Sequence, residues 1–193
     1  MNLYSLLTKE DIYFSLKKKG KKNEIIYQED ELCQYVCILK KGEVGIVSYS
    51  LSGQEIVYNE IEEGGIFGHN LLLSDHPYFR GHVIAKKDYE ILLYSKEAFL
   101  RVLQNNKEFL NAYLMLEANF TKKLNGQIKL LSFSSAEDRL LYYLKENKVL
   151  KFKSVSALSE SLFLTREALS RTISKMVKDG KISRKGNMLE LLM

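Results

Sequence analysis

The chain of 193 residues is poor in the residues that mark secreted or disordered proteins: it has one proline, two cysteines and no tryptophan. With 46% hydrophobic residues, it is long enough to bury a sizeable core, and nothing in its composition indicates disorder. It lacks a run of about 18 apolar residues, which a membrane-spanning helix would need. The opening segment, residues 1–7, lacks the pattern of a signal peptide, so we expect a cytoplasmic protein with no membrane contact.

Few residues in this sequence could bind a metal ion or form a disulfide. Cys33 and Cys37 are too few for a disulfide framework and are half of a four-thiolate zinc or iron–sulfur site. We interpret them as small residues on or beside a strand, with a redox-sensing pair as the alternative. His69, His76 and His82 share one segment, but no paired carboxylate completes a site. We therefore expect no metal and no resident cofactor.

Charge is distributed unevenly along the chain. The net charge of +5 lies entirely in residues 151–193, which hold nine Lys and Arg against four Asp and Glu, whereas residues 1–150 hold 20 of each. A polyanion would bind in this basic part, although a solvated basic face is the simpler explanation of the charge alone.

The first half of the sequence has the pattern of a β-rich domain. Short runs of β-branched and aromatic residues alternate with Gly-containing turns, which predicts an antiparallel barrel or jelly roll. The predicted strands cover residues 25–27, 35–39, 44–49, 55–58, 82–85 and 89–94, and one predicted turn is Ser52–Gly53. A short helix from about Thr8 to Lys18, with Thr8 as its N-cap, is expected before them.

The periodicity changes near Asn106. Apolar residues then recur at steps of three and four, which predicts a helix of about seven turns with one apolar stripe. The stripe consists of Tyr113, Leu116, Phe120, Leu124, Ile128 and Leu131. It could pack on the barrel, but a helix this long between two compact regions favours pairing with its own copy in a parallel dimer.

The remaining sequence predicts a winged helix-turn-helix. Ser134 and Ser135 offer an N-cap for one helix, and Thr165 caps another that runs from Arg166 to Lys178 and ends at Asp179–Gly180. Residues 182–191 then form a predicted hairpin with a basic tip.

The helix at residues 166–178 has the composition that reading of DNA bases requires. Arg166, Glu167, Ser170 and Arg171 face outward, opposite Leu169, Ile173 and Met176. Arginine can donate two hydrogen bonds to guanine, and glutamate can accept one from cytosine. A helical hairpin with a merely solvated charged face is the alternative.

Several motifs of this chain resemble the Crp/Fnr family of transcription regulators, which includes the cyclic-AMP receptor protein. The similarity extends over nearly the whole chain. Its motifs are Lys41–Val44, Ser52–Glu55, Gly64–Gly68, Thr165–Arg171 and Met176–Ile182.

This resemblance implies a role for individual residues. The positions that match Arg166, Glu167 and Arg171 meet base edges, Thr165 matches a phosphate contact, and Ser170 completes a pattern similar to the anaerobic-regulator branch. Lys185, at the hairpin tip, is expected to contact a phosphate. The resemblance further implies a homodimer on a palindromic site with half-sites resembling TTGAT, and RNA polymerase as a partner. One departure is Phe163, which occupies a turn position where the family has Gly or a small polar residue.

The residues that hold a cyclic nucleotide in this family are changed here. Gly68 is followed by His69, where the family has Glu, and Arg80 lies one place after the position of the phosphate-binding Arg, which is Phe79. A shift of one residue turns a side chain to the opposite face of a strand. Gly68, His69 and Arg80 remain candidate effector-pocket residues, but we expect neither cyclic AMP nor cyclic GMP to bind. The cysteine cluster of the oxygen-sensing branch is absent as well.

We therefore predict an α+β protein with a jelly-roll sensor barrel at residues 1–105, a dimerisation helix at 106–133 and a winged helix-turn-helix at 134–193. Its predicted function is sequence-specific DNA binding without enzymatic activity. The main alternative is a small-ligand sensory module that acts through a protein partner. A cupin-type metal enzyme is a second alternative, and it lacks the ligand set.

Overall fold

The computed structural model describes residues 2–49, 53, 55–147 and 149–192. These residues form two compact units, Met1–Ala118 and Asn119–Met193, and helix α4 contributes to both. Ser52, at the predicted turn, and Gln54, in the same motif, lie outside the described residues.

The N-terminal segment forms helices shorter than expected. A 3-10 helix, η1 (Tyr4–Leu6), precedes α1 (Lys9–Tyr13). Thr8 is the N-cap, as predicted: its Oγ1 accepts a hydrogen bond from the Asp11 backbone N–H at 3.1 Å. The prediction that this helix continues to Lys18 is wrong. Residues Leu16–Gly20 form strand β1, because they pair along their whole length with the apolar strand β8.

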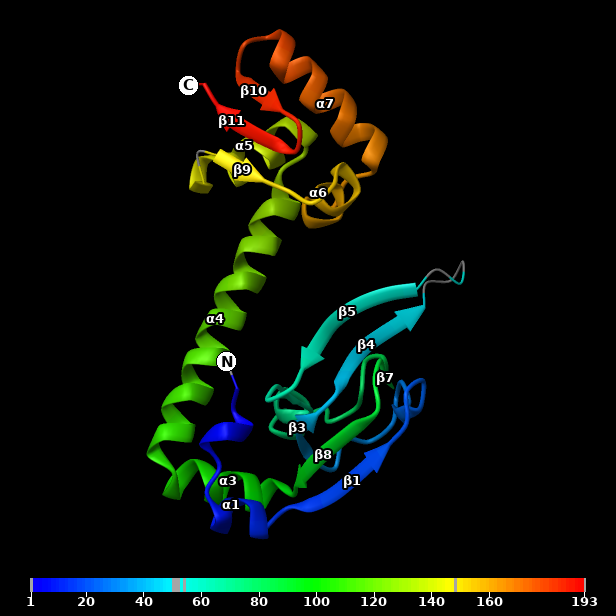
Figure 1. Ribbon diagram of the computed structural model, residues 1–193, viewed down its shortest axis with the longest axis vertical. Coiled ribbons are helices and arrows are strands. Elements are labelled where there is room, and N and C mark those ends of the chain that lie inside the picture. The colour runs from blue at the N-terminus through cyan, green and yellow to red at the C-terminus, as the bar shows by residue number, and fades with distance from the viewer. Residues whose placement is uncertain (1, 50–52, 54, 148, 193) are drawn as a thin grey trace. The chain divides into compact units, whose positions relative to one another are not determined.

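Two four-stranded sheets make up the barrel, and every strand pair in them is antiparallel. The first sheet has the order β1-β8-β3-β6 and the second β2-β7-β4-β5. In Figure 1, β4 and β5 form the long hairpin drawn in cyan. The remaining strands are β2 (Ile25–Tyr27), β3 (Val36–Lys41), β4 (Glu43–Tyr49), β5 (Glu55–Glu62), β6 (Ile66–Phe67), β7 (His82–Ala85) and β8 (Tyr89–Tyr94). The jelly-roll prediction is therefore confirmed.

Strand β8 shows how the unit is built in layers. Ile91 and Leu93 point into the barrel, where they join a core with side chains of both sheets. Leu92 and Tyr94 point the other way, against helices that cover the first sheet. Because successive side chains of a strand face opposite sides, a strand buried on both faces is apolar throughout.

The covering layer contains a helix that the sequence analysis did not predict, α3 (Lys96–Asn105), with Phe99 and Val102 buried. Another such helix, α2 (His69–Leu72), directly follows the motif Gly64–Gly68. Helix α4 (Lys107–Ser132) has the predicted extent. Asn106 fixes its start: Oδ1 accepts from the Phe109 backbone N–H at 2.9 Å, and Nδ2 donates to Asp11 at 2.8 Å.

The C-terminal unit combines the end of α4 with three further described helices and a small sheet. Its core unites Leu130 of α4 with apolar residues of the later helices and strands. The elements are α5 (Ala136–Asn147), β9 (Val149–Lys151), α6 (Val155–Ser161), α7 (Arg166–Lys178), β10 (Ile182–Lys185) and β11 (Met188–Leu191). The sheet has the order β10-β11-β9, so the predicted hairpin has gained a third strand.

Candidate nucleic-acid interface

Helix α7 begins and ends where the sequence predicts. The Oγ1 atom of Thr165 accepts a hydrogen bond from the Ala168 backbone N–H at 3.1 Å, which makes Thr165 the N-cap. This bond uses a lone pair of the hydroxyl, so its proton stays available to an acceptor outside the protein. The helix is followed by Asp179 and by Gly180, whose φ is 69°.

The two faces of α7 differ in burial as expected. Leu169, Ile173 and Met176 are buried in the core of the C-terminal unit. The predicted contact residues are all exposed: Thr165, Arg166, Glu167, Ser170, Arg171 and Lys185. In the described part of the chain, no carboxylate pairs with Arg166 or Arg171 and no cation pairs with Glu167. The side chains that would meet bases are therefore free to do so.

The turn between α6 and α7 keeps its left-handed backbone despite the bulky residue there. Phe163 has a φ of 53°, and its side chain is 44% exposed. Arg139 of α5 supports this turn: its Nη1 donates to the Phe163 carbonyl oxygen at 2.9 Å, and its Nε donates to the Phe133 carbonyl oxygen at 3.1 Å. A charged donor thus holds the turn against the end of α4 and the start of α5.

The wing is tied to the rest of the unit at its tip and at its base. At the tip, Asn187 Nδ2 donates to the Lys153 carbonyl oxygen at 2.9 Å, and Lys185 stays exposed. At the base, Glu137 of α5 accepts a hydrogen bond from Lys181 and lies 3.4 Å from Nζ of Lys175. Lys181, followed by Lys175, holds the pKa of the Glu137 carboxyl below its ordinary value. These two lysines are already paired, so they are poor candidates for DNA contacts.

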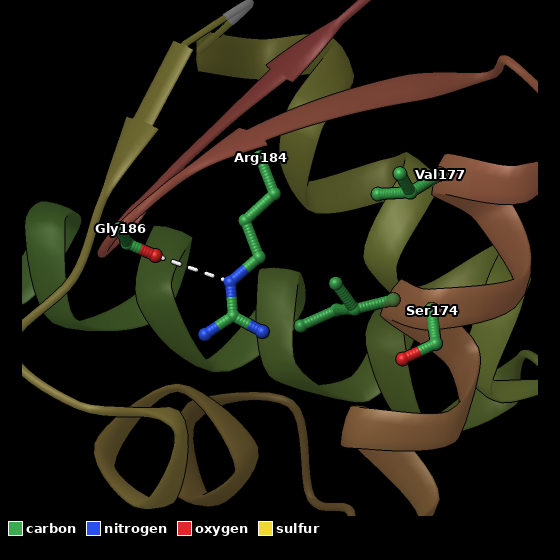
Figure 2. A pocket seen from close by; sticks show the side chains of 5 residues that line it. Ser174, Val177, Arg184 and Gly186 are labelled. Carbon is green, nitrogen blue, oxygen red and sulfur yellow. Dashed lines mark hydrogen bonds between the residues drawn. The ribbon is translucent and has the colours of Figure 1, made fainter.

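A groove lies between α7 and the wing. It is lined by Ile173, Ser174, Val177, Arg184 and Gly186. Figure 2 shows the side chain of Arg184 leaving β10 and lying beside α7, with Nε donating to the Gly186 carbonyl oxygen at 3.1 Å.

The barrel interior is occupied by the side chains of the chain itself. Phe79 is 2% exposed, and its ring stacks on Tyr27 with centroids 4.5 Å apart. Arg80, the next residue, is exposed, so the two side chains lie on opposite sides of the backbone. Gly68 has a φ of 77° and is the N-cap residue of α2, and a Cβ there would lie 2.7 Å from the Tyr35 carbonyl oxygen.

His69 faces the long helix. Its Nε2 lies 2.8 Å from Oε1 of Glu117, and its ring meets that of Tyr113 edge-on. Burial lowers the pKa of His69, and the Glu117 carboxylate opposes this effect. Of the predicted pocket residues, Gly68 and His69 are adjacent at the start of α2, whereas Arg80 is exposed.

Both cysteines are buried in the barrel core. Burial raises the pKa of Cys33 to about 11, and it raises that of Cys37 as well. Among the residues that the structure describes, no three His, Cys, Asp or Glu side chains cluster as a metal site would require.

Comparison with known families now places the first unit. Residues 17–106 match the family model of the cyclic nucleotide-binding domain. This segment is therefore similar to that domain family. The match covers the barrel and α3, and it agrees with the resemblance to Crp/Fnr regulators. A search of curated proteins finds no match.

Solved structures extend the likeness to both units. A mutant form of CooA from Carboxydothermus hydrogenoformans has a TM-score of 0.64 at 20% identity and covers 99% of this chain and 91% of its own. The catabolite activator protein of Thermus thermophilus has a TM-score of 0.61 at 21% identity, over 99% and 93%. A transcriptional regulator from Thermotoga maritima has a TM-score of 0.60 at 24% identity, over 68% and 98%. The chain thus has the fold of these regulators. None of its described helices could cross a membrane.

The sequence analysis did not identify several residues that contact the candidate site residues in each of the two units. In the first unit it located His69 but missed Glu117, which lies far along the chain. In the C-terminal unit it missed Arg139 and Arg184. Arg184 could have been identified from the sequence, because it is a basic residue two places before Gly186. No neighbouring residue in the sequence marks Arg139 as important.

Proposed function

We propose that this chain is a sequence-specific DNA-binding transcription regulator that places α7 in the major groove. One observation carries this proposal: the solvent face of α7 presents Arg166, Glu167 and Arg171 exposed and unpaired in the described chain, beside a basic wing. Exposed, unpaired side chains of these types on the outer face of the second helix are the groups that contact base edges when such a helix lies in the major groove. The names of the similar structures, a catabolite activator protein and a transcriptional regulator, support the same reading.

Each exposed group has a suitable acceptor or donor on DNA. Arg171 and Arg166 can donate two hydrogen bonds to O6 and N7 of guanine, and Glu167 can accept from the amino group of cytosine. Ser170 can contact either base type. Thr165 and Lys185 flank these residues and would donate to phosphates, which fixes the register of the helix on the duplex.

We further propose that the regulator acts as a homodimer through α4. Tyr113 of the apolar stripe is buried against the barrel, but Phe120, Leu124, Ile128 and Leu131 continue the stripe with 38–65% of their surface exposed. A row of exposed apolar residues at helical spacing is stabilised by a second helix. Two copies would place two recognition helices on a palindromic site, with half-site centres separated by roughly 10 bp or a small multiple of it.

The sensor pocket is, in this proposal, unsuited to cyclic nucleotides. A cyclic phosphate needs a charged fork, and the side chain that faces inward near that position is Phe79, stacked on Tyr27. Binding by this chain would therefore not require cyclic AMP. The DNA-bound dimer would act in the cytoplasm, with RNA polymerase as its protein partner.

Selection from random duplex DNA tests this proposal. The wild-type chain should select a palindrome with half-sites resembling TTGAT. Arg171→Ala should bind the selected site more weakly by about 1–3 kcal/mol and accept any base at one position of each half-site. Arg171→Lys is the matched control for charge, since it keeps the cation but loses the two-donor fork. Equal weakening of selected and scrambled duplexes by Arg171→Ala would show that α7 does not read bases.

Salt dependence separates this proposal from a protein-docking role. DNA binding through phosphates weakens steeply as salt rises, whereas an interface of mixed polarity weakens little. A shallow salt dependence with no selected sequence would favour a sensory module that acts through a protein partner.

A further inference from the structure

The groove between α7 and the wing contains a cation whose partner is missing from the described chain. Arg184 uses one of its five N–H groups, the one on Nε, to donate to the Gly186 carbonyl oxygen. No carboxylate of the described residues pairs with it. The four N–H groups on Nη1 and Nη2 therefore remain to bind an acceptor from outside.

The hydrogen bond to Gly186 fixes where this guanidinium lies. Gly186 has a φ of 59°, which a residue with a side chain rarely adopts, and its carbonyl oxygen accepts from the residue two places earlier. The fork is thereby held beside α7, as Figure 2 shows, and does not extend past the hairpin tip. A side chain held in this way has already lost part of the conformational entropy that binding costs.

The other residues of the groove restrict the chemistry of its occupant. Val177 is 41% exposed, so α7 contributes apolar surface, whereas Ile173 lies beneath it at 1% exposure. Ser174 already donates its hydroxyl proton to the Ser170 carbonyl oxygen at 3.0 Å. The occupant therefore needs anionic oxygens for Arg184 and aliphatic carbon for the α7 side. A sugar–phosphate chain has both.

We propose that Arg184 binds a phosphodiester of the DNA backbone in this groove, with the adjoining deoxyribose against the exposed side chain of Val177. This inference rests on the proposed function and adds to it a phosphate contact separate from Thr165 and Lys185. A planar guanidinium matches two phosphate oxygens at once, which a lysine cannot do. Because the fork is held beside α7, it contacts the backbone next to the recognition helix and reads no base.

The test measures affinity of the full chain for its selected duplex and for a scrambled duplex over a series of salt concentrations. Arg184→Ala should weaken both duplexes by roughly tenfold and reduce the slope of log K against log salt by about one, the value for one phosphate. Arg184→Lys should keep the slope, because the charge remains, and should recover only part of the affinity. Lys96→Ala is the control, since it removes one exposed positive charge from α3 of the barrel unit. It should match the wild type in both measurements.

Several results would overturn the inference. If Arg184→Ala left affinity and salt slope unchanged while Arg171→Ala relaxed base selection, the groove would not bind phosphate although the proposed function held. If Arg184→Ala altered the selected bases at the edge of the half-site, Arg184 would be a base-reading residue. If it left DNA binding intact and weakened only the recruitment of RNA polymerase, the groove would be a protein-docking site. Absence of duplex binding by the wild type would refute the proposed function together with this inference.

Discussion

The Nη1 atom of Arg139 lies 2.9 Å from the carbonyl oxygen of Phe163 and donates a hydrogen bond to it. The acceptor belongs to a residue in the left-handed region, with a φ of 53°, where a residue with a Cβ is strained by about 1–2 kcal/mol. Leu162, the preceding residue, is fully buried, so the turn is anchored in the core on one side and by the arginine on the other. A strained turn is therefore retained because its surroundings fix it.

A matched pair of substitutions measures this strain. Phe163→Ala and Phe163→Gly both remove the half-exposed ring, but only glycine relieves the left-handed backbone. We expect the glycine variant to be the more stable by about 1 kcal/mol, although glycine is usually the less stable of the two. Urea unfolding of the C-terminal unit, followed by circular dichroism, measures the difference. If alanine proved as stable as glycine, the turn would not be strained in solution.

The exposed part of the α4 stripe predicts assembly. Ile128 is 65% exposed, and Ile128→Asp would place a charge within the proposed helix pair. We expect this variant to sediment as a monomer at micromolar concentration and to lose tight binding to the palindrome. Lys122→Asp, on the opposite face of the same helix, should remain dimeric. A wild-type monomer that still bound a single half-site tightly would contradict the dimer.

The filled barrel predicts indifference to cyclic AMP. A ligand raises the melting temperature only by binding the native state, so millimolar cyclic AMP should produce no thermal shift and no change in DNA affinity. The selected duplex is the positive control, because it should raise the melting temperature of the same sample. A clear shift with the nucleotide alone would mean that Phe79 and Tyr27 move aside for it.

The burial of His69 predicts a loss of stability in acid. Its pKa is lowered from an ordinary value of 6.5, so below about pH 6.5 the unfolded chain binds a proton that the folded chain does not. The free energy of unfolding should fall as the pH drops from about 6.5, by at most about 1.4 kcal/mol per pH unit. His69→Gln should reduce this slope, and His76→Gln, at an exposed position, should not. Identical slopes in all three proteins would mean that Glu117 fully offsets the burial.

The two thiols should be inert in the folded protein. Burial raises the pKa of Cys33 to about 11, so at pH 8 almost none of it is the reactive thiolate, and burial raises the pKa of Cys37 as well. A thiol-specific chromogenic reagent should label neither cysteine in native buffer and both in strong denaturant. Peroxide should leave DNA affinity unchanged. Rapid labelling of the native protein would revive the redox-sensing alternative.

The features that were predictable from the sequence are those encoded locally. Helix α7 was predicted to the residue because Thr165, its apolar stripe and Gly180 all lie within one short segment. Strand β1 was missed because Lys17 and Lys19 give it no apolar character, and only its pairing with β8 makes it a strand. For α3, Ser95 and the spacing of Phe99 and Val102 were a sufficient signal that went unused.

The supporting contacts could not be predicted in this way. Glu117 approaches His69, and Arg139 approaches Phe163, only after the chain has folded. The position of a guanidinium such as that of Arg184 depends on the conformation of a glycine two residues away. The sequence therefore indicated which side chains are chemically suited to DNA but not which contacts fix them in place.

The wing is attached to the rest of the C-terminal unit at several points, which limits how an effector could regulate DNA binding. Strand β9 pairs with β11, Asn187 donates to Lys153, and Glu137 connects the wing base to α5, so the residues proposed to read bases and those proposed to bind phosphates form one rigid body. An effector that acts on the C-terminal unit can therefore change the position of this unit, but it can hardly change the arrangement of α7 and the wing within it. The preferred half-site should then be the same in every functional state of the proposed dimer. Only the tolerated spacing between half-sites should change, and libraries that vary the spacer at constant half-sites would detect such control.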